Sequence, residues 1–410
     1  MISRTILRSI EECIASRPVT LVTGARGTGK TTVCRFIAEK YGFGYVSLAT
    51  GSDRAVAVSD PELFLRIHPA PVIIDEVQYA PGLFDAIESI VDAKKFECGS
   101  NKGMYVLSSS HTYGLMKGVT QSMAGRIGMI DISPLSMSEI LGREERPFVV
   151  DFESNCRRSA ERVLSIDEVY GMIIRGGYPE LYDEPDMTPS EFYSDYMDTY
   201  LDRDVPNIIN LKDKPKFRRF MEYTASLTGR ELVYDDISRA VGISIPTVQT
   251  WLNILAMTGL VHLLPPYSEK HNTKRIIRRP KIYFRDTGLA CYLAKMFDAE
   301  TLRVSYLGGH MVETFIINEI MKTYSNNTEG AGFYYYRDSS KNGIDLLILR
   351  NATLSLVECK AGMTYDSTDV KAFSGLDKSD YAVGPSCLIC LTEKAYPLRP
   401  GVYALPISSI

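Results

Sequence analysis

The chain has 410 residues, of which 45% are hydrophobic and 23% charged, and its formal net charge is -4. This length is greater than that of a domain with a single hydrophobic core, so we expect two or three domains. The composition excludes a largely disordered chain. The slightly negative net charge excludes a surface coated in basic residues. No apolar run reaches membrane-spanning length. Because eight cysteines show no regular pairing, we expect a reduced, cytoplasmic protein without a membrane anchor.

A glycine-rich loop follows the first predicted strand, residues 19–23, and precedes a predicted helix that begins near Lys30. The loop fits the P-loop pattern GxxxxGKT, whose glycines let backbone N–H groups turn toward phosphates at the positive end of the helix. We expect Lys30 to reach the outer phosphates of ATP and Thr31 to hold Mg²⁺. The alternative is a glycine turn without a ligand. The expected ATP-binding residues are Gly24, Ala25, Arg26, Gly27, Thr28, Gly29, Lys30, Thr31 and Thr32.

Two adjacent acids, Asp75 and Glu76, end a second short apolar strand at residues 72–74. A P-loop site needs an acid at this place, so Asp75 is predicted to hold Mg²⁺ together with Thr31. Glu76 follows at once and is placed to orient a water toward the γ-phosphate, which predicts hydrolysis and not binding alone. The alternative is that the two acids cap the next helix.

Two further strands complete the predicted sheet of the first third. Residues 103–110, GMYVLSSS, end in serines, and Ser108 is predicted to sense the γ-phosphate from between the two preceding strands. Arg126, in the turn before the fourth strand, is predicted to stabilise charge on a nucleotide in its own subunit or in a neighbouring copy. Because serines are also common in turns, the alternative for Ser108 is a turn residue with no role toward the nucleotide.

The segments GARGTGKTT, VIIDEVQYAP and PLSMSEI resemble those of the AAA-type ATPases. Together with GGYPEL, YLDRDV and YFRDTGLACYL, they resemble an uncharacterised bacterial and archaeal group in which an ATPase domain precedes a C-terminal domain of unknown function. The resemblance implies an α/β fold, with an AAA-like parallel sheet in residues 1–145. Ser109 departs from the group, which usually has a glycine there.

The middle of the chain, residues 146–268, is predicted to be a helical and winged-helix domain. Residues 235–241 and 245–257 read as two helices joined at Gly242, with Ser244 as the cap of the second. The second helix contains Gln249, Thr250 and Asn253 but no Lys or Arg. DNA or RNA binding would therefore depend on the following basic segment, and the alternative is a packing or protein-partner module. The cations of that segment are Lys270, Lys274, Arg275, Arg278, Arg279, Lys281 and Arg285.

The last third contains an apolar hairpin, residues 343–360, that carries three ionisable groups. If Asn351 and Ala352 form the turn, Asp345 lies opposite Glu358, and strand alternation puts Lys360 on the face of Glu358. Two facing carboxylates among apolar residues need a cation between them. A divalent metal, with Lys360 nearby, meets that need.

This acid followed by an ExK triplet resembles the core of PD-(D/E)XK nucleases, with Ile344 where the family has proline. The resemblance implies a smaller α/β, restriction-endonuclease-like domain in residues 269–410. It implies Asp345 and Glu358 as metal ligands and Lys360 as the group that positions the attacking water. A third carboxylate is expected from the preceding helix, with Glu313 as first choice and Glu319 as second. The alternative is an inherited fold whose acids and lysine form only a charge network.

The whole chain is therefore predicted to be an ATPase that acts on, or is regulated by, DNA or RNA. The rival prediction is an ATP-dependent switch or scaffold that binds a protein partner and carries an inactive nuclease-like domain. Because Arg126 could act on a nucleotide in a neighbouring copy, a homo-oligomer is also expected.

Overall fold

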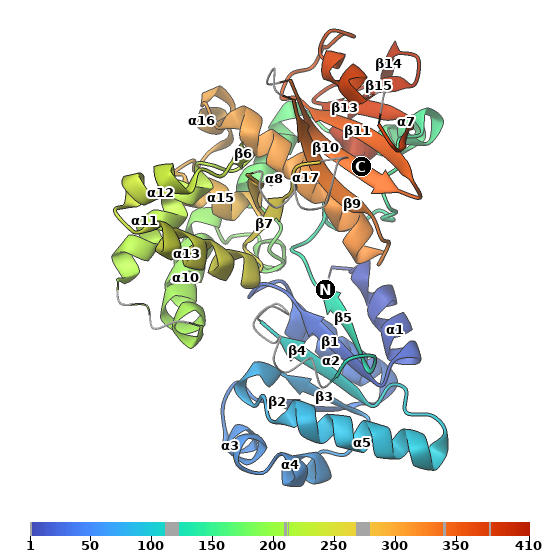
Figure 1. Cartoon of the computed structure of the whole chain (residues 1–410), viewed down its shortest axis with the longest axis vertical. Coiled ribbons are helices and arrows are strands. Elements are labelled where there is room, and N and C mark those ends of the chain that lie inside the picture. The colour runs from blue at the N-terminus through green and yellow to red at the C-terminus, as the bar shows by residue number, and fades with distance from the viewer. Residues whose placement is uncertain are drawn as a thin grey trace.

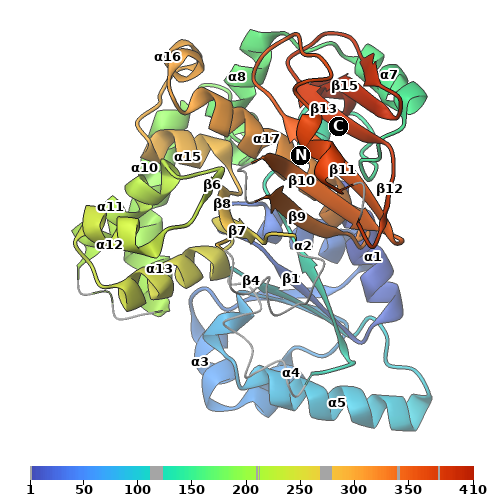
Figure 2. The same cartoon turned by 45° about the horizontal axis from the view of Figure 1, so that its top comes forward.

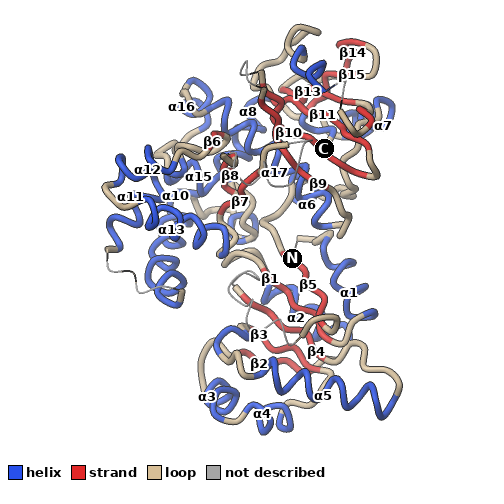
Figure 3. The backbone as a smooth tube through the Cα atoms, in the orientation of Figure 1, coloured by secondary structure: helices blue, strands red, loops and turns tan. Residues whose placement is uncertain are grey.

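The computed structural model describes residues 2–110, 123–208, 211, 213–267, 279–338, 342–376 and 379–410. Figure 1 shows the helices and strands of residues 6–109 and the strand of residues 127–131 as a lower region, helices from residues 189–304 at the left, and the strands of residues 332–406 at the upper right. The turned view in Figure 2 and the tube in Figure 3 show the same three regions.

The lower region is a five-stranded, wholly parallel sheet in the order β2-β3-β4-β1-β5. Its strands β1, β3 and β4 are fully buried, as expected for a parallel sheet covered on both faces. The strands are β1 (Val19–Thr23), β2 (Gly44–Ser47), β3 (Val72–Asp75), β4 (Tyr105–Ser109) and β5 (Ile127–Asp131). The helices are α1 (Ile6–Ser16), α2 (Lys30–Tyr41), α3 (Ser52–Ser59), α4 (Pro61–Ile67), the 3-10 turn η1 (Val77–Tyr79), α5 (Leu83–Cys98) and α6 (Met137–Ile140).

Side-chain alternation in β1 builds a core on each face of this sheet. Val22 packs with residues of α1 and α2, whereas Leu21 packs with residues of α4 and α5 on the other face. The C-terminal edge of the parallel strands is left for the loops that follow β1, β3 and β4. Those loops carry the expected nucleotide-binding residues.

The middle region is mainly helical and encloses the aromatic residues of α10. Tyr193 and Tyr196, with Tyr200 directly after the helix, are all buried and form part of the core. Its first helices are α7 (Phe152–Glu161), α8 (Ile166–Arg175), α9 (Glu180–Asp183), α10 (Pro189–Thr199), the π-helical turn η3 (Tyr200–Asp204) and the 3-10 turn η4 (Val205–Asn207).

In the part of the chain that the structure describes, five helices and a three-stranded sheet follow. The sheet has the antiparallel order β6-β8-β7 and includes β8, which lies beyond the boundary expected at residue 268. The elements are α11 (Lys214–Ala225), β6 (Arg230–Glu231), α12 (Tyr234–Val241), α13 (Ile245–Met257), β7 (Val261–Leu264), β8 (Lys281–Phe284), α15 (Thr287–Leu293) and α16 (Ala299–Val304). Among the described residues no single helix is long and apolar enough to cross a membrane, although α12 and α13, bent by 101°, meet that test jointly.

The C-terminal region is a mixed sheet of seven strands in the order β14-β15-β13-β11-β10-β9, with β12 beside β11. The buried helix α17 joins this sheet to the core of the middle region. The elements are α17 (Gly308–Asn326), β9 (Gly332–Arg337), β10 (Gly343–Arg350), β11 (Thr353–Cys359), β12 (Ala382–Val383), β13 (Ser386–Cys390), β14 (Tyr396–Arg399), β15 (Val402–Pro406) and the 3-10 turns η5 (Lys371–Leu376) and η6 (Ile407–Ser409).

The hairpin of β10 and β11 has the predicted register. Arg350 pairs with Thr353 and Leu346 with Val357, so the same register places Asp345 opposite Glu358. The turn residues Asn351 and Ala352 have φ values of 48° and 59°. Positive φ at both positions is typical of the type I′ turn, whose twist matches that of the flanking strands.

Candidate nucleotide site and C-terminal acid cluster

The loop between β1 and α2 has the shape expected of a phosphate cradle. Gly24 and Gly29 have φ values of 145° and 91°, which side chains rarely adopt. A Cβ on Gly24 would lie 2.3 Å from the backbone oxygen of Ile132, so the loop runs against the chain that leaves β5. The helix begins at Lys30, with its N-terminus at the loop. This geometry fits phosphate oxygens.

Lys30 closes the loop on itself. Its Nζ donates hydrogen bonds to the backbone oxygens of Gly24 at 3.0 Å and Ala25 at 2.8 Å. Burial lowers the pKa of this lysine, and the carboxylate of Glu76 is the main opposing influence. The Thr28 hydroxyl also donates to the Ala25 oxygen, whereas Thr31 and Thr32 are exposed on the first turn of α2.

Asp75, at the end of β3, accepts hydrogen bonds from hydroxyl groups of three different elements. It accepts hydrogen bonds from Thr31 Oγ1 at 3.1 Å, from Tyr45 OH at 2.7 Å and from Ser108 Oγ. The predicted pair Thr31 and Asp75 is thus together, and β4 lies between β1 and β3 as predicted for the strand of Ser108. These are oxygen ligands of the kind that Mg²⁺ prefers.

Glu76 turns sharply out of β3. It has a φ of 60°, and its N–H donates to Ser108 Oγ at 3.0 Å. Its carboxylate accepts from Ser110 Oγ at 2.9 Å and from the amide of Gln78. A left-handed conformation is costly for a residue with a side chain and is concentrated at functional sites. Glu76 is therefore held beside Asp75 by polar side chains of β4 and η1.

The middle region covers the outer side of the loop. Arg26 Nη1 lies 3.3 Å from Asp204 Oδ1, and a Cβ on Gly27 would meet the Tyr178 ring at 3.3 Å. Asp204 is buried, which raises its pKa, and its Oδ2 has no hydrogen-bond partner in the part of the chain that the structure describes. Sequence reasoning did not assign Tyr178 or Asp204 to the site.

Two further arginines hold the same edge of the sheet. Arg4 donates to the backbone oxygens of Thr28 at 2.8 Å and Ser133 at 2.7 Å. Arg285, which follows β8, donates to Asp131 Oδ2 at 2.5 Å and to Ser133 Oγ at 2.7 Å. Neither was predicted, because a lone arginine in a helix or after a strand gives no sequence signal of its partner.

Arg126 does not lie at the nucleotide site of its own chain. It precedes β5 and is paired with Asp92 at 2.6 Å and Glu88 at 3.1 Å, both on α5. β5 runs parallel to β1, and Ile127 pairs with Val19 at the start of both strands. Arg126 therefore lies at the N-terminal ends of the strands, whereas the P-loop lies at their C-terminal ends. The expectation that Arg126 faces its own nucleotide is therefore wrong, and a role toward a neighbouring copy stays a prediction.

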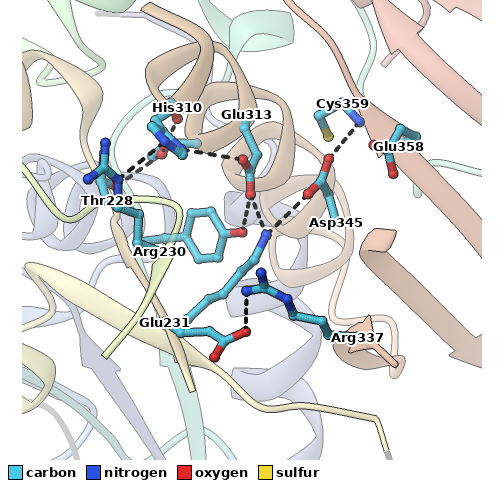
Figure 4. A network of polar contacts seen from close by, with 12 residues as sticks. Thr228, Arg230, Glu231, His310, Glu313, Arg337, Asp345, Glu358 and Cys359 are labelled. Atoms are coloured by element: carbon cyan, nitrogen blue, oxygen red, sulfur yellow. Dashed lines mark hydrogen bonds and ion pairs between the residues drawn. The ribbon is translucent and has the colours of Figure 1, made fainter. Parts of the chain in front are cut away.

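The C-terminal acids lie where α17, β10 and β11 meet (Figure 4). Lys281 Nζ bridges Glu313 Oε1 at 2.8 Å and Asp345 Oδ1 at 3.1 Å. Burial is the largest single influence on Glu313 and opposes its charge, but the ammonium of Lys281 and the neighbouring hydrogen-bond donors together lower the pKa of Glu313. Burial and the neighbouring Glu313 raise the pKa of Asp345. The structure thus brings two of the predicted acids together, around a cation from β8.

Glu358 and Lys360 pair with each other next to this bridge. Lys360 Nζ donates to Glu358 Oε1 at 2.6 Å. Burial, followed by the charge of Asp345, raises the pKa of Glu358 to about 8. Glu319, the second choice for a carboxylate, lies elsewhere: it accepts from the Met137 N–H at 2.6 Å and from Lys322 at 2.8 Å. It is a helix-capping residue of α6 and not part of the cluster.

The structure describes three of the seven cations of the basic segment. Lys281 and Arg285 are paired with carboxylates, and Arg279 is exposed. The other four, Lys270, Lys274, Arg275 and Arg278, lie outside the described residues.

The parallel sheet, the P-loop after β1 and the acid pair at the end of β3 are those of a P-loop ATPase fold. Residues 16–141 match the family described as AAA domain. Residues 166–300 and 308–410 match two families described as domains of unknown function, DUF8612 and DUF4143.

Two mycobacterial relatives match nearly the whole chain. The chain is 24% identical over 397 residues to uncharacterized proteins of Mycobacterium bovis and Mycobacterium tuberculosis, covering 96% of this chain and 81% of theirs. Among solved structures, the Walker-type ATPase PABY2304 of Pyrococcus abyssi has a TM-score of 0.43 at 13% identity, over 72% of this chain and 96% of that one. AMPPCP-bound DnaA from Aquifex aeolicus has a TM-score of 0.26 at 13% identity, over 61% and 85%.

Proposed function

We propose that the protein binds ATP with Mg²⁺ at the P-loop, hydrolyses it, and uses the nucleotide to change how the loop contacts the middle region. The observation that carries the proposal is the hydroxyl-lined Asp75 beside Glu76 and Thr31, at the edge where the P-loop meets Asp204. The proposal treats residues 1–145 as the ATPase domain. It treats residues 146–268 as a winged-helix domain and residues 269–410 as a nuclease-like domain.

The residues have distinct tasks in this proposal. The N–H groups of residues 24–32 and the ammonium of Lys30 would hold the phosphates, while Thr31 and Asp75 would hold Mg²⁺, whose chemistry is to neutralise phosphate charge. Lys30 would exchange its two carbonyl partners in the loop for phosphate oxygens. Glu76, fixed by Ser110 and Gln78, would orient the attacking water, and Ser108 would link the positions of Asp75 and Glu76.

The test compares ATP binding with ATP turnover in the full chain. Glu76→Gln should keep ATP affinity and lower kcat by about 10²-fold or more, since it removes the charge that orients the water. Lys30→Ala should lose binding. Glu62→Gln, an exposed acid on α4, is the matched control and should behave as the wild type. Unchanged turnover in Glu76→Gln would refute the hydrolytic role, and unchanged binding in Lys30→Ala would refute the nucleotide site.

A second candidate function is nucleic-acid binding through α13. The support is the arrangement of α11 to α13 with the β6-β8-β7 sheet, as in a winged helix, and the exposure of Gln249, Thr250 and Asn253 on α13. Because α13 carries no cation, such binding would be weak unless the segment before β8 supplies phosphate contacts. Oligonucleotide affinity that is absent, or that does not fall as salt rises, would count against it.

A further inference from the structure

The acid cluster of the C-terminal region already has its hydrogen-bond donors. Glu313 Oε1 accepts from Lys281 Nζ at 2.8 Å and from Tyr283 OH at 2.6 Å. Its Oε2 lies 3.7 Å from His310 Nδ1. Asp345 Oδ1 accepts from Lys281 at 3.1 Å and Oδ2 from the Cys359 N–H at 3.1 Å. Three of the four oxygens of Glu313 and Asp345 therefore accept a hydrogen bond, and the fourth, Glu313 Oε2, lies near His310 beyond hydrogen-bond distance (Figure 4).

Lys281 reaches this cluster from a different sheet. It is the first residue of β8, which pairs with β6 and β7, whereas Glu313 is on α17 and Asp345 is on β10. Its side chain is 14% exposed, and those of Glu313 and Asp345 are 11% and 17% exposed. Tyr283, two residues further along the same face of β8, contacts Glu313 as well. The ammonium is thus held between two elements of the C-terminal region by a strand of the middle sheet.

The same carboxylates do not fit a divalent metal in this arrangement. A Mg²⁺ ion needs about six oxygen ligands at ~2.1 Å, and here one oxygen of each acid is taken by an ammonium. Glu358, the third acid, is paired with Lys360. Among the described residues no group of three or more His, Cys, Asp or Glu is arranged to hold a metal ion. The donors present complete an ion-pair network instead.

We propose that Lys281 is the resident cation of this cluster: its ammonium takes the place that a divalent metal would need, and the cluster fastens β8 to α17 and β10. This proposal does not depend on ATP binding. It makes the acids of the nuclease-like hairpin a junction between the middle sheet and the C-terminal sheet. Two buried carboxylates that share one cation are stabilised only while that cation stays, so removing it should destabilise the fold.

Charge arithmetic predicts what happens when Lys281 is removed. In the bridge itself, Glu313 and Asp345 contribute two negative charges and Lys281 one positive charge, which leaves a net charge of -1. Lys281→Met keeps a long side chain but changes the sum to -2, frees Asp345 Oδ1 and leaves Glu313 Oε1 with Tyr283 as its donor. Such a site should attract a divalent cation, whereas the native one should not.

The experiment is thermal unfolding of the full chain without nucleotide, with and without Mn²⁺. We expect Lys281→Met to lower Tm, and Mn²⁺ to restore several degrees of it. Lys281→Met combined with Asp345→Asn should show no such rescue, and wild type and Asp345→Asn should respond to Mn²⁺ alike. Lys295→Met, an exposed lysine paired with Glu222, is the matched control and should show neither effect.

Two outcomes would overturn the proposal. One is a Mn²⁺-dependent rise of Tm in the wild type that Asp345→Asn abolishes, because the native cluster would then hold metal. The other is a Lys281→Met chain with wild-type Tm and no response to Mn²⁺. If Lys281→Met does not fold, direct Mn²⁺ titration of the wild type and of Asp345→Asn decides: equal binding supports Lys281 as the resident cation, and binding lost with Asp345 overturns it.

Discussion

At the scale of single residues, the P-loop shows how a missing side chain can be a structural requirement. Gly24 has a positive φ, and the nearest atom to its missing Cβ is a backbone oxygen that cannot rotate away. Gly42, at the other end of α2, also has a positive φ of 69° but has nothing within 4 Å of the added atom. A side chain at Gly42 would therefore cause backbone strain alone, whereas one at Gly24 would cause both backbone strain and a clash at the P-loop.

We predict that Gly24→Ala loses ATP affinity while Gly42→Ala keeps it. Each alanine should lower the free energy of unfolding by about 1 to 2 kcal/mol, because a left-handed conformation costs roughly that much. Only Gly24→Ala also displaces the loop, which should weaken ATP binding by at least about 10-fold, or roughly 1.4 kcal/mol. Titration with a fluorescent ATP analogue and thermal unfolding measure the two effects separately. Equal ATP affinity in both variants would contradict the cradle geometry.

At the scale of elements, the sequence predicted those features that depend on neighbours along the chain. The helix of residues 245–257 and the register of the β10–β11 hairpin follow from a capping serine, a two-residue turn and strand alternation, all of which are local. The partner of Asp345 did not follow, because Lys281 is 64 residues away and reaches it from another sheet. The position of Arg126 was also beyond local patterns, since the edge at which it lies depends on strand pairing.

The short sheet β6-β8-β7 contains a partly buried histidine, His262, with a testable consequence. The His262 ring on β7 stacks on Tyr283 of β8 with centroids 5.3 Å apart, and its Nε2 is buried without a hydrogen-bond partner among the residues described. Burial, with a smaller contribution from Arg285, lowers the pKa of His262 to about 3. In the unfolded chain the pKa of histidine is about 6.5.

We predict that His262 makes the fold acid-sensitive below about pH 6.5. Between the two pKa values the unfolded chain binds a proton that the folded chain does not, so stability falls as pH falls, by up to about 1.4 kcal/mol per pH unit. His262→Phe keeps a stacking ring and removes the proton site. Its Tm should therefore drop less than that of the wild type between pH 7 and pH 5. Parallel pH curves for the two proteins would show that His262 is not held neutral.

At the scale of the whole molecule, the candidate nucleotide site is in contact with the middle region through two ion pairs. Arg26 of the P-loop is paired with Asp204, and Arg285 after β8 is paired with Asp131 at the end of β5. The same strand β8 carries Lys281 into the C-terminal acid cluster. A change of charge at the P-loop can therefore act on contacts with the middle region, and β8 continues from there to the C-terminal sheet.

We predict that Asp204→Asn tightens ATP binding. Asp204 is paired with Arg26, and its carboxyl group lies beside the loop in which Lys30 and Arg26 would meet the phosphates, where a negative charge would oppose them. Asparagine keeps the shape and removes the charge, so ATP affinity should rise by roughly 5-fold, or about 1 kcal/mol. Asp202→Asn is the matched control, because the Asp202 side chain is 66% exposed and paired with Lys214 outside the loop; its ATP affinity should not change. Nucleotide titration alongside thermal unfolding keeps a folding defect apart from a binding effect. Weaker or unchanged ATP affinity in a folded Asp204→Asn protein would show that Asp204 does not restrain the loop.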